Sequence, residues 1–296
     1  MQTVDIDVAV VPVAGLGTRL LPATKSQPKE MLPVGRKPVV QYVVEELTRV
    51  GIHQILFITG RRKASIENHF DMDHALIQLL REQGKEELLA QLEFERAPVQ
   101  YFYTRQRRQL GLGHAVLHAR HFVGQRPFVV ALGDSIIGLH AQSRVIERMK
   151  EVFVDQDADA VIAFETVPPH EVDKYGIARP RGDGTIFPLE DVVEKPSPEE
   201  APSNLAIAAR YIFSPRIFDA LERTGFGAGG EIQLTDAIRL LIQEGGNVYG
   251  VRLAPGERRY DIGNFPSYFR AFVEFALADD LYGPDLRAYL QGLLHT

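Results

Sequence analysis

The stretch Val8–Pro33 reads VAVVPVAGLGTRLLPATKSQPKEMLP, and it decides how the rest of the chain is interpreted. Its first part, 8–13, is an apolar β-branched run, typical of a strand buried on both faces. The run then breaks into the loop 14–18, where Gly15 and Gly17 allow the backbone to turn sharply and point its N–H groups at a ligand. Arg19 and Lys29 add positive charge close by. These features predict a loop that binds a polyphosphate; a plain glycine turn is the alternative.

Two familiar phosphate-binding loops do not fit this stretch. A dinucleotide-binding fingerprint requires a third glycine at position 20, where the chain has Leu20, and Pro22 would interrupt the helix that should follow. A Walker A loop requires a glycine directly before Lys-Ser, whereas Lys25 follows Thr24. The loop is therefore predicted to bind phosphate without belonging to either class, and a dehydrogenase is disfavoured.

The composition limits the possible partners. With 296 residues, 45% of them hydrophobic, the chain can bury a sizeable core, and its net charge of −6 argues against a general nucleic-acid or anionic-membrane binder. The absence of cysteine excludes disulfides, thiolate metal ligands and a cysteine nucleophile. The first residues carry acids and no basic segment, and no apolar run approaches the ~20 residues of a membrane-spanning helix. We expect a cytoplasmic protein without a nucleic-acid or membrane partner.

Strands and helices alternate along the whole chain. A helix over 38–50 and a buried strand over 54–59 follow the first strand, which predicts a right-handed strand–helix–strand unit. Further strands are predicted at 99–104, 128–132, 158–165, 177–179, 186–195, 206–213 and 248–253, and further helices at 61–70, 76–97 (two helices separated by Gly84), 114–120, 215–223, 234–244 and 266–277. This alternation predicts one α/β domain over 1–296, with a mixed, mostly parallel central sheet flanked by helices and antiparallel additions in its later part.

Two candidate binding segments follow predicted strands, at the sheet edge where ligands bind in α/β folds. The first contains Gln106 and the glycines Gly111 and Gly113; an RNA-binding arm is the alternative for its arginines, although three arginines in an acidic chain are a weak footprint. The second is the segment 133–135. Its Asp134 would lie beside the first glycine loop if the two strands are neighbours, and it could equally cap the following turn.

Several motifs occur in a fixed order: AGLGTRLLPATKSQPKEMLP (14–33), RQ (105–106), LGLGHAV (110–116), LGDS (132–135), KYGI (174–177), VEKP (193–196), APSNLAIAARYIF (201–213), GGEIQLTD (229–236) and YDIGN (260–264). In this combination the chain resembles the bacterial UTP–glucose-1-phosphate uridylyltransferases (UDP-glucose pyrophosphorylases), within the sugar nucleotidyltransferase superfamily. The resemblance spans Val8–Leu277. It implies a Rossmann-like nucleotide-diphospho-sugar transferase fold, with a nucleotide-binding part over about 1–135 and a sugar-phosphate-binding and C-terminal part over about 136–296.

The resemblance also implies a reaction, UTP + glucose 1-phosphate → UDP-glucose + pyrophosphate, assisted by Mg²⁺, and a homodimer or homotetramer. The attacking group is the sugar phosphate, whose second pKa of about 6 leaves it ionised near neutrality without a catalytic base. The site has to bring two anions together, hold them in line at the α-phosphorus and neutralise charge on the departing pyrophosphate. Backbone N–H groups, arginine, lysine and a metal ion held by carboxylates suit these tasks.

The resemblance assigns a role to each candidate site residue. The nucleotide would be bound by Ala14, Gly15, Leu16, Gly17, Thr18, Gln106 at the uracil edge and Gly111. The implied catalytic residues are Arg19 and Lys29, which would meet the departing phosphates, and Lys195, which would meet the sugar phosphate. The sugar-phosphate-binding set consists of Gly176, Glu194, Lys195 and Asn204. Asp134 and Asp261 would hold the Mg²⁺.

Four positions depart from the family pattern: Ser135, Ala209, Arg36 and Ile262. Ala209 stands where the pattern has glycine, and its methyl group near the expected sugar pocket puts the sugar preference in question. A related enzyme that uses dTTP or another hexose 1-phosphate is an alternative, because a hydrophobic pocket distinguishes one methyl group by only ~1–3 kcal/mol. A non-catalytic sugar-nucleotide-binding relative is a more remote alternative. Such a protein should have lost Asp134, Asp261 or Lys195, and all three are present.

Overall fold

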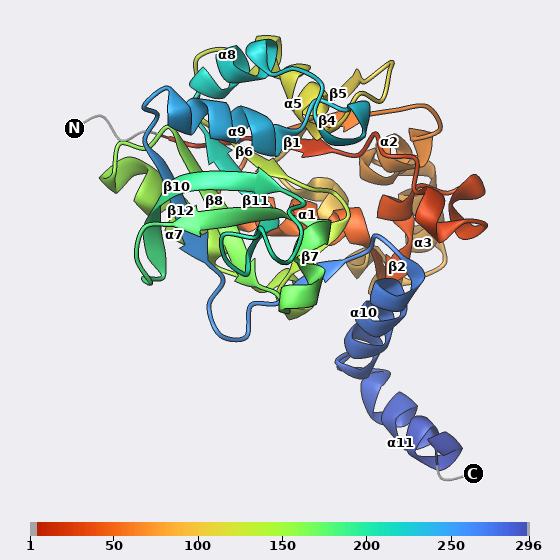
Figure 1. Cartoon of the computed structure of the whole chain (residues 1–296). Coiled ribbons are helices and arrows are strands. Elements are labelled where there is room, and N and C mark those ends of the chain that lie inside the picture. Colours follow the sequence, from red (N-terminus) through yellow and green to blue (C-terminus); the bar gives the residue numbers. More distant parts are fainter. Residues whose placement is uncertain (1–4, 295–296) are drawn as a thin grey trace.

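A central sheet of nine strands organises the molecule (Figure 1). The computed structural model describes residues 5–294; positions 1–4, part of the N-terminal segment without basic residues that supports the expected cytoplasmic location, lie outside it. In spatial order the strands are β5 (Gln100–Arg105), β4 (Gln54–Thr59), β1 (Val8–Pro12), β6 (Phe128–Ala131), β11 (Leu205–Phe213), β8 (Ala160–Thr166), β12 (Val248–Arg252), β10 (Ile186–Glu194) and β9 (Gly176–Pro180).

The strand directions change along the sheet. β5, β4, β1 and β6 are parallel neighbours, and β8 is parallel to β12. β11 runs antiparallel to both β6 and β8, and β10 runs antiparallel to both β12 and β9. Seven of the nine strands therefore point one way, with β10 and β11 opposed to them. The expected mixed, mostly parallel sheet is confirmed, and its antiparallel strands lie in the later part of the chain.

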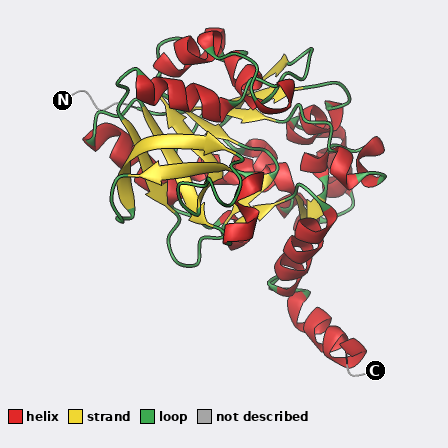
Figure 2. Cartoon of the chain, in the orientation of Figure 1, coloured by secondary structure: helices red, strands yellow, loops and turns green. Residues whose placement is uncertain are grey.

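Helices cover both faces of the sheet (Figure 2). The α-helices of the described chain are α1 (Val39–Arg49), α2 (Ala64–Phe70), α3 (His74–Glu82), α4 (Glu86–Ala90), α5 (Leu112–Leu117), α6 (Arg120–Val123), α7 (Val145–Asp155), α8 (Arg216–Arg223), α9 (Leu234–Gln243), α10 (Phe265–Leu277) and α11 (Gly283–Leu294). Side chains of β1 alternate between the two faces. Val8 and Val10 pack in one core with α5, α8 and α9, whereas Ala9 and Val11 pack in a second core with α1, α2 and α7.

Two short ribbons complete the fold. β2 (Pro33–Val34) pairs with β3 (Lys37–Pro38), and β7 (Ser135–Ile137) pairs with β13 (Arg259–Asp261). Helices α10 and α11 extend away from the body of the molecule, with the C-terminus at their far end (Figure 1). None of the helices described within 5–294 is long and apolar enough to cross a membrane.

An unusual turn in β11 places an arginine in the core. Ala209 has a left-handed φ of +59°, a conformation that favours glycine, and the pairing of β11 with β8 is irregular between Ile207 and Tyr211. The next side chain, Arg210, is 0% exposed and binds Glu46 of α1, with Nη2 and Oε2 2.6 Å apart. Arg210 Nη2 also donates to the carbonyl of Ser135 at 2.9 Å. The family's usual glycine at position 209 is therefore explained by the backbone conformation.

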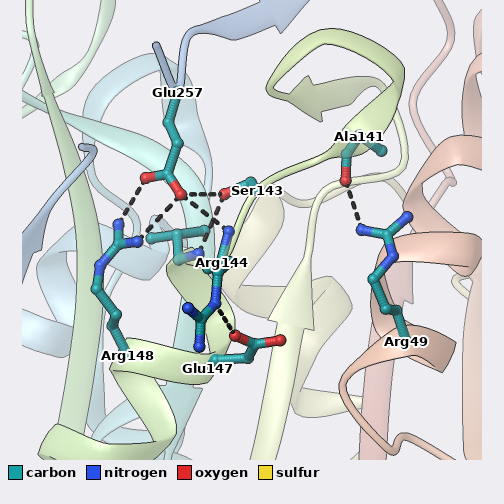
Figure 3. A network of polar contacts seen from close by, with 8 residues as sticks. Arg49, Ala141, Ser143, Arg144, Glu147, Arg148 and Glu257 are labelled. Carbon is teal, nitrogen blue, oxygen red and sulfur yellow. Dashed lines mark hydrogen bonds and ion pairs between the residues drawn. The ribbon is translucent and has the colours of Figure 1, made fainter. Parts of the chain in front are cut away.

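Glu257 ties the loop between β12 and β13 to the start of α7 (Figure 3). Its carboxylate accepts hydrogen bonds from Ser143 Oγ at 3.0 Å, from the backbone N–H of Arg144 at 2.9 Å and from both terminal nitrogens of Arg148. The backbone N–H of Ala254 donates to it at 2.7 Å. Burial alone would raise the pKa of Glu257, but these hydrogen bonds lower it to about 2.

Candidate active site

A cavity of about 570 Å³ brings most of the predicted site residues together. It lies where β1, β5 and β6 end, and it extends to residues of β9, β10 and β11. The predicted site residues that line it are Ala14, Gly15, Leu16, Gly17, Thr18, Arg19, Lys29, Gln106, Gly111, Asp134, Gly176, Glu194 and Lys195. Of the remaining two, Asp261 lies close behind the wall, and Asn204 is exposed on the loop before β11 and does not line the cavity.

The glycine loop after β1 presents free backbone donors. Gly17 has a φ of +68°, and its carbonyl is held by Thr24 Oγ1 at 2.7 Å. Gln109 Nε2 holds the carbonyl of Ala14 at 2.9 Å. Within the described part of the chain, the N–H groups of Gly15 and Leu16 donate to no residue. With its carbonyls fixed by side chains and its N–H groups open, the loop is suited to bind an anion.

Lys29 and Asp134 form an ion pair at the floor of the cavity. Lys29 Nζ donates to Asp134 Oδ2. The Asp134 carboxylate holds the pKa of the Lys29 ammonium above its usual range, against the opposite effect of burial. Burial would raise the pKa of Asp134, but the charge of Lys29, the hydrogen bond from Lys29 and a backbone hydrogen bond together outweigh burial, and the pKa lies below the usual range. Both groups are therefore charged at neutral pH.

A second buried pair supports Lys29 from behind. Glu30, the next residue, is 1% exposed and binds Lys63 Nζ at 2.7 Å. Lys63 comes from the segment between β4 and α2, so a cation from that segment secures the backbone beside Lys29.

The ribbon β7–β13 brings the two predicted metal ligands together. Asp261 lies opposite Ser135 in this ribbon, and the N–H of Ile262 donates to the carbonyl of Asp134 at 2.9 Å. Burial, and next the neighbouring charge of Asp134, raise the pKa of Asp261. A side chain at Gly263 would meet Asp261 Oδ2 at 2.7 Å and Arg19 Nη2 at 3.1 Å, so glycine there keeps the space between them open.

This aspartate pair fits a magnesium ion. Two neighbouring, partly buried carboxylates favour a shared cation, and Mg²⁺ prefers one or two carboxylates with waters and phosphate oxygens as its other ligands. Residues 5–294 contain no cluster of three or more histidine, cysteine or acidic side chains that could hold a metal. The donor set therefore suits a metal shared with a phosphate ligand.

Gln106 and the LGLG segment form a second corner of the cavity. Gln106 is 5% exposed, and its Nε2 lies 3.1 Å from the carbonyl of Gly111 and 2.9 Å from His114 Nδ1. Gly111 has a φ of +100°, and a Cβ there would lie 2.6 Å from the carbonyl of Ile232. The N–H of Ile232 donates to the carbonyl of Leu110 at 2.7 Å. The motifs LGLGHAV and GGEIQLTD therefore bind each other, and the glycines permit this close approach.

The opposite wall carries the sugar-side candidates. In the antiparallel pairing of β9 with β10, Gly176 lies opposite Glu194, which explains how two motifs of separate sequence position reach one site. A Cβ at Gly176 would meet Ile207 Cδ1 at 2.8 Å. Lys195 follows with a left-handed φ of +47°, and its Nζ lies 3.3 Å from Glu194 Oε1. Its side chain is 48% exposed, which leaves the ammonium accessible to a ligand.

Arg259 also lines the cavity, although the sequence motifs assign it no role. Its side chain is 8% exposed, donates through Nε to Glu165 Oε1 and lies 4.5 Å from the ring centre of Tyr175. Arg259 precedes Asp261 by two residues in β13, and alternate residues of a strand share a face. That spacing is the signal that could have identified it. Gln109 also lines the cavity and was not among the predicted site residues. Its uncharged amide follows Arg107 and Arg108, whose charges dominate the sequence pattern there.

The chain belongs to the nucleotidyl transferase family, whose model matches residues 8–276. It is 46% identical to the UTP–glucose-1-phosphate uridylyltransferase YngB of Bacillus subtilis, over 97% of this chain and 95% of that protein. It is 41% identical to a UTP–glucose-1-phosphate uridylyltransferase of Staphylococcus epidermidis, over 96% of this chain and 97% of that protein.

Solved structures of similar proteins have the same fold. A UTP-bound UGPase from Acinetobacter baumannii superposes with a TM-score of 0.85 at 37% identity, over 97% of this chain and 99% of that chain. A UDP-glucose pyrophosphorylase complexed with UDP-glucose superposes with a TM-score of 0.82 at 35% identity, over 92% of this chain and 98% of that chain. The Rossmann-like nucleotide-diphospho-sugar transferase fold implied by the motifs is thereby confirmed.

Proposed function

We propose that this chain is a UTP–glucose-1-phosphate uridylyltransferase, which converts UTP and glucose 1-phosphate into UDP-glucose and pyrophosphate. The observation that carries the proposal is the single cavity that gathers the glycine loop, Lys29, Asp134, Glu194 and Lys195. Proteins 41–46% identical over nearly the full chain have names that state this activity.

The nucleotide side holds UTP through backbone and fixed charge. The open N–H groups of the loop 14–18 bind phosphate oxygens, and Gln106 with Gly111 receives the uracil. Arg19 is exposed at the cavity mouth, and it meets the β- and γ-phosphates as the bond from the α-phosphorus to the bridging oxygen breaks. Lys29 lies deeper and stabilises the same developing charge.

The sugar side presents the nucleophile. Lys195 holds the phosphate of glucose 1-phosphate, one of whose oxygens forms the new bond to the α-phosphorus of UTP. The carboxylate of Glu194 accepts from glucose hydroxyls, and the missing side chain at Gly176 leaves room for the ring. Asn204 is a weaker member of this group, since it lies outside the cavity wall.

Asp134 and Asp261 are the residues that would hold Mg²⁺. When bound, the ion supplies positive charge beside the phosphates and draws them together. Lys29 contacts Asp134 directly, so in the absence of a metal its ammonium neutralises the carboxylate that the ion would share. The two aspartates would supply oxygen ligands to that ion, because a carboxylate repels a phosphate unless a cation lies between them.

The experiment is a substrate panel that measures pyrophosphate release. The protein is incubated with Mg²⁺, glucose 1-phosphate and UTP, dTTP, CTP, ATP or GTP in turn, and then with UTP and galactose 1-phosphate or mannose 1-phosphate. We expect the fastest release with UTP and glucose 1-phosphate. No release with UTP, or much faster release with dTTP, would overturn the assignment. The second series tests whether the methyl group of Ala209, which lines the cavity, changes the sugar preference.

A homodimer or homotetramer is part of the proposal. It is supported by large apolar side chains on α10 and α11 that are exposed in the single chain: Phe269 (58%), Phe272 (39%), Val273 (44%) and Tyr289 (66%). Exposed apolar side chains of this size are typical of a protein–protein contact. Light scattering that gives a mass near 33.1 kDa, that of one chain, would contradict it.

A further inference from the structure

The side-chain amide of Gln106 can have only one orientation in this site. One of its terminal atoms lies 3.1 Å from the carbonyl oxygen of Gly111. A carbonyl oxygen only accepts hydrogen bonds, so the atom that faces it is the NH₂ group, Nε2. The other terminal atom, which remains for a ligand, is therefore the acceptor Oε1.

His114 uses the second hydrogen of the same NH₂ group. Its Nδ1 lies 2.9 Å from Gln106 Nε2, and since Nε2 donates, Nδ1 has to accept. The imidazole is then neutral, with its hydrogen on Nε2. Burial, and next the neighbouring ring of His118, lower the pKa of His114, which favours this neutral form. Both amide hydrogens of Gln106 are thus committed to the protein.

We propose that His114 is a positioning residue that makes the site selective for a pyrimidine base with a hydrogen on N3. By fixing the amide of Gln106, it directs only an acceptor, Oε1, at the base. Uracil and thymine donate an N3 hydrogen to such an atom, whereas N3 of cytosine carries a lone pair that repels it. The inference rests on the proposed function, in which the base lies against Gln106.

The backbone of the same segment completes the recognition pattern. The N–H of Gly111 donates to no residue in the described part of the chain, so it is available to a carbonyl oxygen of the base. An acceptor beside a donor complements the N3–H and adjacent carbonyl of uracil. For cytosine in the same position the acceptor meets a lone pair. A buried polar group left unpaired in this way discriminates more strongly than the fit of one methyl group.

The experiment compares kcat/KM for UTP and CTP, which share the ribose and triphosphate. In His114→Leu, which fills the space without an acceptor, we expect the UTP-to-CTP ratio to fall by about tenfold or more, because Gln106 loses one of its two constraints. In His114→Asn, whose amide oxygen can accept in the same place, we expect the ratio to stay within about threefold of the wild type. Should His114→Leu not fold, His114→Ala takes its place.

His118→Leu is the matched control. His118 lies one turn further along the same segment, its ring centre is 4.7 Å from that of His114, and it makes no hydrogen bond to Gln106. We expect it to keep the wild-type ratio. A ratio in His114→Leu within twofold of the wild type would overturn the proposal, and so would an equal fall in His114→Leu and His114→Asn.

Gln106→Leu separates this inference from the proposed function. If Gln106→Leu keeps the wild-type ratio, the base does not lie against Gln106, and the proposed nucleotide position fails together with the role of His114. If Gln106→Leu lowers the ratio and His114→Leu does not, only the role of His114 fails.

Discussion

Two ion pairs lie at the end of β6, one partly exposed to the cavity and the other buried in the core. Lys29–Asp134 faces the cavity, with its side chains 15% and 18% exposed and a second carboxylate, Asp261, beside it. Glu46–Arg210 lies in the core with its side chains 1% and 0% exposed. Arg210 donates two further hydrogen bonds, to the carbonyls of Ala209 and Ser135. The first pair has room for a ligand, and the second has none.

The difference teaches that burial and charge alone do not mark a functional group. We propose a functional role for Asp134 because its oxygens can exchange one cation for another, whereas four of the five N–H groups of the Arg210 guanidinium already donate within the protein. The core pair Glu46–Arg210 nevertheless supports the cavity pair Lys29–Asp134. Arg210 Nη2 donates to the carbonyl of Ser135, directly after Asp134. The core ion pair thus fixes the backbone next to Asp134.

Breaking the cavity pair Lys29–Asp134 should have the largest effect, and this effect should be on the reaction rate. We expect Asp134→Asn to lower the rate of pyrophosphate release at least about 10³-fold, since a neutral amide cannot hold the metal or Lys29 as a carboxylate does. Asp261→Asn should act in the same way, with the circular dichroism spectrum of both variants unchanged. Asp183→Asn, in an exposed turn, is the control and should keep the wild-type rate. A near-normal rate in either site variant would refute the metal assignment.

Breaking the core pair Glu46–Arg210 should instead lower the stability of the fold. We expect Arg210→Met to lower the free energy of unfolding by about 3–5 kcal/mol, because Glu46 is left charged and unpaired in the core. The double variant Glu46→Met/Arg210→Met removes both charges and should recover much of this loss. Urea unfolding measures both. If the double variant is no more stable than Arg210→Met, the cost does not come from the unpaired carboxylate.

Glu257 offers a third, smaller effect that depends on pH. Its folded pKa of about 2 lies below the ordinary glutamate value, so its stabilisation is complete above about pH 4.5 and is lost as the pH falls toward 2. Glu257→Gln should lower the free energy of unfolding by about 1–2 kcal/mol at pH 6, allowing for solvent screening, and by almost nothing near pH 2. Glu199→Gln, an exposed control, should show no such pH dependence. A loss of the same size at both pH values would mean that the charge of Glu257 does not stabilise the fold.

Local signals in the sequence were enough to predict that the glycine loop and Gln106 lie at one cavity. The glycine loop and Gln106 each follow a strand of clear hydrophobic pattern, and parallel strands β1, β4 and β5 place both at one sheet edge. Gly176 and Glu194 meet through a hairpin-like pairing of neighbouring strands. In these cases short-range pattern and strand order are enough to bring the residues together.

Local sequence patterns could not predict contacts between residues that are far apart in the chain. Nothing near Asp261 indicates that the three-residue strand β13 pairs with β7, although this pairing puts it beside Asp134. Glu46 and Arg210 are 164 residues apart and lie on a helix and a strand whose patterns are those of plain core elements. For Asn204, a matching motif was not enough to place the residue in the cavity. The carbonyl of Asn204 accepts a hydrogen bond from the N–H of Val167 at 3.0 Å, and the residue is exposed to solvent outside the cavity. Its role stays a prediction.

The contact of Ile232 with the LGLG segment has a consequence for the chain as it is being made. Synthesis releases the N-terminus first, at about 5–20 residues per second. The glycine loop, Gln106 and Asp134 therefore leave the ribosome well before Ile232, which braces the corner around Gly111, and before Asp261. A nascent or truncated chain that ends before Ile232 contains the glycine loop 14–18. It lacks the contact of Ile232 with the LGLG segment, and it lacks Asp261, which lies beside Asp134 in the complete chain. Under the proposed function, we expect a chain that ends before Ile232 to bind UTP more weakly than the complete chain.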